Sequence, residues 1–354
     1  AFTVTGIALA VALQISGAFW LDAIAHIVDV QFRQVQQGDV LVNFHRPVPL
    51  TVVQDLQRLP GVMAAEPYRS EPVRVRLHGL TEDASLMGLV DDAQLLRAVD
   101  DARGPVAMPA SGLVMSSLLA NAVGARVGDR VEVEFRLWNQ TRAPVEVVDI
   151  VHTMMGKQAF MNLHAMNALA RDGAGVAEAA LRVDPLAMAD FWAAVKRAPV
   201  INAVFDKAGS MASFNETTSR NMGVFSGILT LFAVAMAVGI VYNAARITLS
   251  ERAWELASLR VLGMTRAEVS VLLLGELGAE LLLALPIGAV AGWALASLMM
   301  RLMSSDNIDF PVVIEPATYA WAALIVLAAG VVSALMVRRQ IDRLDLVAVL
   351  KVRE

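Results

Sequence analysis

The sequence contains no cysteine, few histidines and no excess of basic residues. Its 354 residues include five histidines, and the formal net charge at pH 7 is −5. Without cysteine, disulfide frameworks and cysteine-based metal or nucleophilic sites are excluded. The net charge gives no reason to expect nucleic acid as a partner. The histidines are scattered without a matching group of carboxylates, so we interpret them as surface or packing residues and predict no metal site.

The common nucleotide-binding and catalytic motifs are also missing. No G-x-x-x-x-G-K-[ST] loop is present, because Gly156-Lys157 is followed by Gln158 and has no glycine five residues upstream. Neither H-E-x-x-H nor G-x-S-x-G occurs, which leaves a zinc protease or an α/β-hydrolase without support. We therefore predict a non-catalytic chain that carries no cofactor of its own.

Apolar residues, by contrast, are abundant. They make up 56% of the chain and give it a mean hydropathy of +0.56. A helix needs about 20 apolar residues to cross a bilayer. Four runs reach that length, at residues 2–21, 224–245, 281–300 and 318–337. The predicted fold class is an α-helical membrane protein with four transmembrane helices and a large α+β domain inserted between helices 1 and 2.

The distribution of charge predicts the orientation of these helices. Arginines flank the second and third runs, and a further group of basic residues follows the fourth, whereas the loop 301–317 holds three acidic residues against one arginine. By the positive-inside rule, both termini are then cytoplasmic and the large domain is extracytoplasmic.

The inserted domain, residues 38–212, is predicted to contain two strand–helix–strand units of similar length. These lie in residues 38–103 and 176–212, and side by side they would form a ferredoxin-like split βαβ layer. Residues 104–175 between them are predicted to form a β-rich insertion. Residues 1–37 form the first helix with a helical stalk, and residues 213–354 form a second stalk followed by helices 2–4.

A charged segment between the second and third apolar runs, residues 246–266, combines arginines and glutamates with an apolar stripe at helical spacing. A short amphipathic helix in this position, predicted at 248–264, lies at the membrane surface or docks on a partner there. The sequence Thr265-Arg-Ala-Glu268 that follows is a capping box, which predicts where the third membrane helix begins.

Two features of the third membrane helix admit more than one interpretation. Glu276 and Glu280 lie one turn apart on one face. They mark either a charge pathway or the membrane interface, where they could pair with Arg246 or Arg260, and we favour the interface. Gly288 and Gly292 form a G-x-x-x-G pattern, which predicts close packing either with a partner subunit or within this chain's own helices.

The layout of four spans, together with the sequences SERAWELASLRVLGMTRAEV and RRQIDRLDLVAVLKVRE, resembles the FtsX-like permease family. This is the superfamily of the MacB exporter and the LolCDE lipoprotein extractor. The resemblance covers essentially the whole chain and is most specific over residues 242–276 and 345–350. It implies a bacterial cytoplasmic (inner) membrane protein whose external domain has a split α/β porter layer with a β-rich insertion.

The resemblance also implies partners and a mechanism. Such permeases work in pairs with an ABC ATPase that binds ATP and Mg²⁺, and the helix at 248–264 would be the coupling helix that docks on it. The second permease half would be another copy of the chain or a partner half, and a periplasmic accessory protein is a further partner. The opening of this sequence resembles the second half of a tandem permease more than a free N-terminus, which makes a tandem half our hypothesis. The ATPase-coupling residues would be Glu251, Arg252, Glu255, Leu256, Leu259 and Arg260.

Two functions follow from this resemblance. In the first, the chain is a permease of the mechanotransmission type, in which ATP hydrolysis by the partner moves the external domain to export or extract a lipophilic or lipid-linked substrate. In the second, the same motion activates an external enzyme, such as a cell-wall hydrolase, and nothing is transported.

The coupling interpretation predicts that Glu251→Arg or Leu256→Asp abolishes stimulation of the partner ATPase. Each change places an unsuitable charge on the predicted docking face, whereas membrane insertion should stay intact because neither residue lies in an apolar run. Stimulated ATP turnover and the amount of chain inserted in the membrane are the two measurements. Unchanged stimulation in both variants would contradict the docking role.

Overall fold

The computed structural model describes two compact units that share two long helices. One unit contains the described residues of Ala1–Ile24, Thr218–Met303 and Val312–Glu354, and the other contains mainly Ala25–Thr217. The description leaves out residues 1, 137–140, 155, 172–174, 252–257, 259–261, 304–310 and 343–354.

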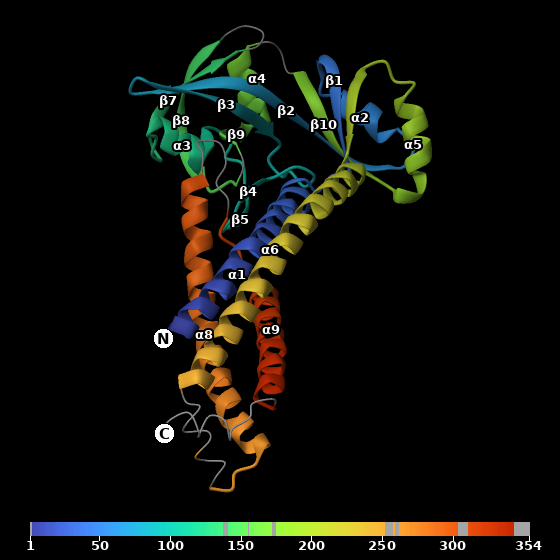
Figure 1. The fold of residues 1–354 in the computed structure, drawn as a ribbon. Helices are drawn as coiled ribbons and strands as arrows, with labels where there is room; N and C mark the ends of the chain where they lie inside the picture. Colours follow the sequence, from blue (N-terminus) through green and yellow to red (C-terminus); the bar gives the residue numbers. More distant parts are fainter. Residues whose placement is uncertain are drawn as a thin grey trace. The chain divides into compact units, whose positions relative to one another are not determined.

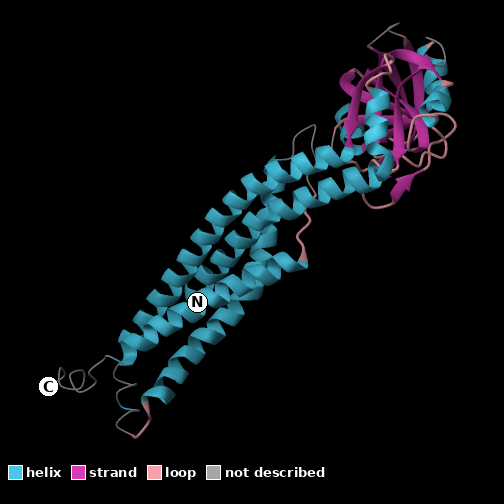
Figure 2. Ribbon diagram, turned by 90° about the vertical axis from the view of Figure 1, so that its right-hand side faces the viewer, coloured by secondary structure: helices cyan, strands magenta, loops and turns pink. Residues whose placement is uncertain are grey.

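Long helices make up the first unit (Figure 2). They are α1 (Phe2–Asp29), α6 (Lys207–Glu251), α8 (Arg266–Met303) and α9 (Pro316–Asp342). Within the described residues, four helical stretches are long and apolar enough to cross a membrane: Thr3–Val35, Gly223–Ala244, Leu274–Met303 and Pro316–Met336. The predicted fold class is confirmed, because an α+β domain lies in the chain between the first and second of these helices.

Helix α1 contacts each of the other three helices of this unit. Gln14 Nε2 donates a hydrogen bond to Thr230 Oγ1 of α6 at 2.9 Å. Asp22 Oδ2 accepts from Glu315 N at 3.0 Å and from Thr318 Oγ1 at 2.6 Å, so this carboxylate caps the first turn of α9. A carboxylate at a helix N-terminus also interacts favourably with the helix dipole.

The G-x-x-x-G pattern of α8 faces α1. A Cβ atom added at Gly288 would lie 2.8 Å from the backbone oxygen of Ala8 and 2.5 Å from Val11 Cβ. At Gly292 it would lie 2.9 Å from Ile15 Cβ. These glycines therefore let two helices of the same chain approach closely. Of the two alternatives that the sequence left open, this is packing within the chain's own helices.

The second unit is built on strands (Figure 1). Its first layer contains β1 (Val40–Pro49), α2 (Val52–Gln57), β2 (Val62–Leu77), β10 (Gly175–Val183), the 3₁₀ turn η2 (Pro185–Ala187), α5 (Met188–Val195) and β11 (Ile201–Asp206). The strands lie in the order β11-β1-β10-β2, with every neighbouring pair antiparallel. This is the strand order of a split βαβ layer, formed by the units β1-α2-β2 and β10-α5-β11.

A barrel continues from the far half of β2. Its further elements are β3 (Leu80–Leu89), β6 (Leu113–Ser116), α3 (Ser117–Val123), β7 (Arg130–Phe135), β8 (Arg142–Val151), β9 (Gln158–Asn162) and α4 (Leu163–Ala170). The strands follow the order β2-β3-β9-β6-β8-β7, and β7 pairs again with β2 and closes the ring. Closure removes the free sheet edges on which other chains could pair.

The two faces of the split βαβ layer pack against two different hydrophobic cores. Val40, Val42 and Phe44 of β1 point into one core, which α2 and α5 cover through Leu56 and Phe191. The opposite face of that layer packs against a second core, which includes Leu95 and Leu96, Phe160 of β9, and Val35 at the end of the first stalk. The segment that enters the domain is thus part of the domain's own core.

A buried ion pair lies where β2 passes from the layer into the barrel. Arg69 Nη2 and Glu71 Oε1 are 3.0 Å apart, with side chains 1% and 4% exposed. Arg69 Nη1 also donates to Asn167 Oδ1 of α4 at 2.9 Å. Close by, the pKa of Glu178 is raised to about 7, chiefly by burial and to a lesser extent by the charge of Glu71, although the Ser70 amide opposes the shift. Removing one partner of such a pair would leave a buried charge uncompensated.

Several elements differ from the sequence-based expectations. The stalk after α1 is not a regular α-helix but continues as the π-helix η1 (Val30–Val35). Residues 62–77 form the single long strand β2, which belongs to both the layer and the barrel, and the hairpin strand β3 was not predicted. Two short strands, β4 (Ala98–Asp100) and β5 (Gly104–Val106), pair separately. Tertiary pairing decided these elements, because their local sequence patterns are short or irregular.

Replacing Gly288 with alanine should destabilise the helical unit by about 1–3 kcal/mol, because the added methyl group meets backbone as well as side chain. Gly278→Ala in the same helix is the matched control, since a Cβ there meets nothing within 4 Å. The control should be neutral or slightly stabilising. Denaturant unfolding of the full chain in detergent micelles measures both, and equal effects would contradict close α1–α8 packing.

Candidate functional site

The predicted coupling stretch lies almost entirely outside the described residues. Glu251 is the last residue of α6, and its side chain is not described. The remaining predicted coupling residues fall in the gaps 252–257 and 259–261, namely Arg252, Glu255, Leu256, Leu259 and Arg260. The docking role of this stretch therefore stays a prediction.

The capping box at the start of α8 is confirmed. Thr265 N donates to Glu268 Oε2 at 2.7 Å, and Glu268 N donates to Thr265 Oγ1 at 3.3 Å. The amide and the hydroxyl of Thr265 both donate to the Glu268 carboxylate and lower its pKa. Glu276 is exposed and Glu280 half-buried, and both lie in the first turns of the apolar stretch that begins at Leu274. Both the interface position favoured for these two carboxylates and their role stay predictions.

The inserted domain holds the end of the first stalk by backbone hydrogen bonds. Arg97 N donates to Val35 O at 3.0 Å, and Gln37 N and Gly38 N donate to Leu95 O at 2.9 and 2.8 Å. The loop that makes these bonds is itself anchored. Glu66 of β2 accepts from Leu95 N at 2.8 Å and also from the preceding amide. The chain leaving η1 is thus fixed to the central strand of the domain.

The start of the second stalk is fixed beside the first. Asp206 caps α6, accepting from Ala208 N and Gly209 N at 3.1 Å each. Lys207 Nζ donates to Gln36 O at 2.9 Å, and Lys207 N donates to Asp39 O at 3.0 Å. Burial lowers the pKa of Lys207, as expected for an ammonium group partly withdrawn from water.

A β-ladder joins the two stalk ends directly. Val40, the first residue of β1, pairs with Asp206, the last residue of β11, and the ladder continues through Leu41 and Phe205. Paired residues in an antiparallel ladder lie about 5 Å apart. We call residues 35–39, 94–97 and 206–209 the stalk junction. Any relative displacement of the two helices must either move β1 and β11 together or break their hydrogen bonds.

The short β4–β5 hairpin supports the junction from the side of the barrel. His26 Nε2 of α1 lies 3.5 Å from Asp101 Oδ1. The neighbouring Asp100, with its side chain 1% exposed, accepts from Arg103 N at 2.8 Å and His152 N at 2.9 Å. Burial disfavours the charged form of Asp100, but these bonds and the Arg103 guanidinium outweigh it and hold its pKa at about 2.

A cavity of about 160 Å³ lies beside the junction, and the residues that line it all belong to the unit of Ala25–Thr217. Its wall includes Val30 and Val35 of η1, Leu96 of the anchoring loop, and Phe160 of the barrel. π-helical turns often occur at functional sites. The structure therefore combines an irregular helix end, a fixed loop and a cavity in one place.

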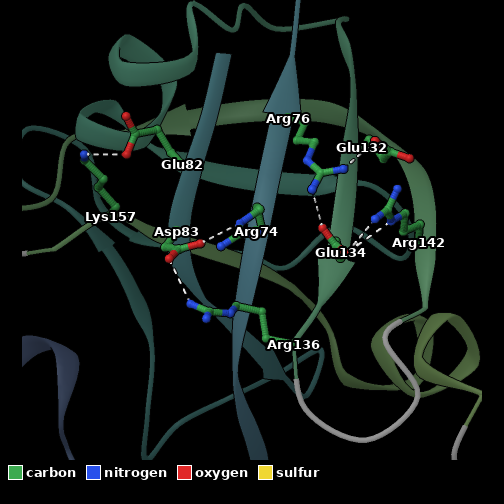
Figure 3. A network of polar contacts seen from close by, with 9 residues as sticks. All are labelled: Arg74, Arg76, Glu82, Asp83, Glu132, Glu134, Arg136, Arg142 and Lys157. Carbon is green, nitrogen blue, oxygen red and sulfur yellow. Dashed lines mark hydrogen bonds and ion pairs between the residues drawn. The ribbon is translucent and has the colours of Figure 1, made fainter. Parts of the chain in front are cut away.

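A network of ion pairs covers part of the barrel surface (Figure 3). Arg76 Nη2 lies 2.8 Å from Glu134 Oε2, and Asp83 bridges Arg74 and Arg136 at 3.0 and 2.8 Å. Most of these side chains are substantially exposed, so each pair contributes at most about 1 kcal/mol. The cations and anions are matched across neighbouring strands, which favours a solvated barrel face over a binding site.

No group of three or more His, Asp or Glu side chains is arranged to hold a metal ion within the part of the chain that the structure describes. Sequence reasoning missed the residues that fix the junction by hydrogen bonds, including Glu66, Asp100 and Lys207. Their partners are backbone amides and carbonyls that lie far away in sequence, and no local pattern marks such contacts.

Comparisons with known proteins support the family resemblance. Residues 227–345 match the profile described as FtsX-like permease C-terminal. Comparison with curated proteins finds no significant match.

Among solved structures, the chain is similar to the periplasmic region of MacB from Actinobacillus actinomycetemcomitans, at 10% identity and a TM-score of 0.38, covering 53% of this chain and 97% of that one. It is also similar to the extracellular domain of the noncanonic ABC-type transporter YknZ from Gram-positive bacteria. There the identity is 13% and the TM-score 0.31, covering 41% and 82% of the two chains.

Asp100→Asn should lower the free energy of unfolding by roughly 2 kcal/mol at pH 7, because an amide cannot accept from both the Arg103 and His152 amides as a carboxylate does. The pKa of Asp100 is depressed in the folded chain, so its contribution is present above about pH 4 and declines as the pH falls toward 2. The difference between wild type and variant should shrink over that range.

Denaturant unfolding at several pH values measures this difference. Asp55→Asn is the matched control, since its side chain is 72% exposed and its ion pair with Arg58 lies on the surface. A pH-independent difference for Asp100→Asn would contradict the assigned ionisation.

Proposed function

We propose that this chain, whose residues 227–345 match the FtsX-like permease C-terminal profile, is the permease subunit of an ABC transporter of the mechanotransmission type. ATP and Mg²⁺ bind to a partner ATPase, and the permease converts the resulting motion into movement of its extracytoplasmic domain. The substrate is lipophilic or lipid-linked and is exported or extracted from the outer side of the membrane.

The observation that carries this proposal is the ladder at the stalk junction. Helices α1 and α6 are the two connections between the membrane helices and the inserted domain, and they end in paired strands. The hydrogen bond from Lys207 to Gln36 adds a tie outside the ladder. A displacement of these helices is therefore passed on to the split βαβ layer through a hydrogen-bonded pair of strands and not through a free loop.

The two stalk helices are long enough to extend beyond the hydrocarbon core of a bilayer. The apolar stretch of α1 and η1 covers 33 residues, or about 50 Å at the rise of a regular helix. The hydrocarbon core is only about 30 Å thick. Helix α6 has sixteen residues before its apolar stretch, Gly223–Ala244, which adds about 24 Å. Both helices can thus carry a displacement past the membrane interface.

The remaining partners belong to the same proposal. The chain lies in the bacterial inner membrane with both termini in the cytoplasm, and a second permease half or a second copy of the chain completes the transporter. Large apolar side chains on the outer faces of the helices, such as Phe232, Trp293 and Trp321, suit contact with lipid or with that second half. The coupling helix at 248–264 docks on the ATPase.

Lys207→Met should uncouple the domain from the ATPase without preventing assembly. The full chain is purified from membranes with its ATPase, and hydrogen exchange of residues 36–44 and 201–209 is measured with and without ATP and vanadate. Wild type should show nucleotide-dependent exchange at both segments. The variant should lose at least half of that difference while keeping basal ATP turnover, because the tie to the Gln36 carbonyl is gone.

Lys196→Met, at an exposed lysine after α5, is the matched control and should behave as wild type. Absence of any nucleotide-dependent exchange in the wild-type segments, or failure to recover an ATPase with the chain, would contradict the proposal. If the wild-type segments respond to nucleotide but no substrate leaves the membrane, activation of an external enzyme is favoured instead.

A further inference from the structure

The cavity beside the stalk junction has the character of a small-ligand site. Apolar side chains from several separate elements line it, including Val30, Leu41, Met87 and Phe160. Its volume of about 160 Å³ is similar to that of engineered cavities that bind benzene. All the residues that line the cavity belong to the unit of Ala25–Thr217, so a ligand there needs no other chain to hold it.

Polar atoms without partners point to what would fill this cavity. Gln36 is 3% exposed, and its Nε2 has no hydrogen-bond partner among the described residues. The same holds for Arg97 Nε and Thr153 Oγ1, and all three residues line the cavity. Two of these atoms can only donate, and the third is a hydroxyl.

Leaving such donors buried and unpaired costs about 1–3 kcal/mol each. Other polar groups nearby are already engaged: Glu66 holds the anchoring loop, and Asp101 faces His26. An occupant that supplied an acceptor would therefore recover hydrogen bonds that the protein does not make itself. The apolar wall would meanwhile bind the rest of the molecule.

We propose that this cavity binds a small apolar molecule of roughly benzene size that carries an oxygen acceptor, either a carbonyl or a carboxylate. The acceptor lies against Gln36 and Arg97, and the apolar part lies against η1 and Phe160. A ligand in this position contacts both the π-helical end of the first stalk and the barrel. Its occupancy would therefore stabilise one arrangement of these two elements.

The experiment uses the full chain in nanodiscs and three fluorinated probes of similar size. 4-Fluorobenzoate supplies a carboxylate, 4-fluoroacetophenone a carbonyl, and 4-fluorotoluene neither. Binding is followed by ¹⁹F NMR line broadening, with empty nanodiscs subtracted to remove partitioning into lipid. At least one of the two acceptor probes should bind saturably and more tightly than 4-fluorotoluene.

Gln36→Leu should weaken binding of the two acceptor probes about tenfold, as expected for one lost hydrogen bond. Binding of 4-fluorotoluene should stay unchanged or become tighter. Thr153→Val tests a second wall of the cavity in case Gln36→Leu unfolds. Gln57→Leu, at an exposed position on α2, is the matched control.

The proposal is overturned if neither acceptor probe binds above the empty-nanodisc signal, since the cavity then holds only water. Thermal unfolding curves first establish that Gln36→Leu and Thr153→Val are folded. The proposal is also overturned if both folded variants bind the acceptor probes as tightly as wild type. The measurement involves no ATPase, so its result does not depend on the proposed transport function.

Discussion

The pairing of Val40 with Asp206 is the constraint on which the rest of the structure depends. It places the end of one long helix beside the start of another, although 165 residues separate them in the chain. Everything between these two positions forms one inserted domain whose entry and exit are adjacent strands. A domain attached in this way can be moved as a body by its two helices, because the hydrogen bonds of the ladder resist their separation.

Supporting contacts reinforce that pairing from several directions. Glu66 fixes the loop that holds Val35, the Lys207 ammonium bonds to the Gln36 carbonyl, and Asp100 organises the hairpin that faces His26. Each of these side chains satisfies backbone groups that would otherwise be unpaired near the domain's core. The same region contains a cavity with unpartnered donors, so the best-fixed part of the domain also has room for a ligand.

The helical unit follows a different rule. Without a hydrophobic driving force between helices in lipid, close approach needs small residues and a few hydrogen bonds. Gly288 and Gly292 supply the first against α1, and Gln14 and Asp22 supply the second. The large apolar residues on the outer faces, such as Phe232 and Trp293, do not take part and stay exposed.

Much of this architecture follows from the sequence alone. Runs of apolar residues determine four spans, because backbone groups in a bilayer must be satisfied within a helix. The two strand–helix–strand units and the Thr265 capping box are also visible locally, since period, proline position and capping chemistry act over a few residues. The tertiary structure alone decided the closure of the barrel through β2 and β7, the irregular end of the first stalk, and the junction with its cavity. Those features rest on hydrogen bonds and packing between residues distant in sequence, whose partners no local pattern specifies.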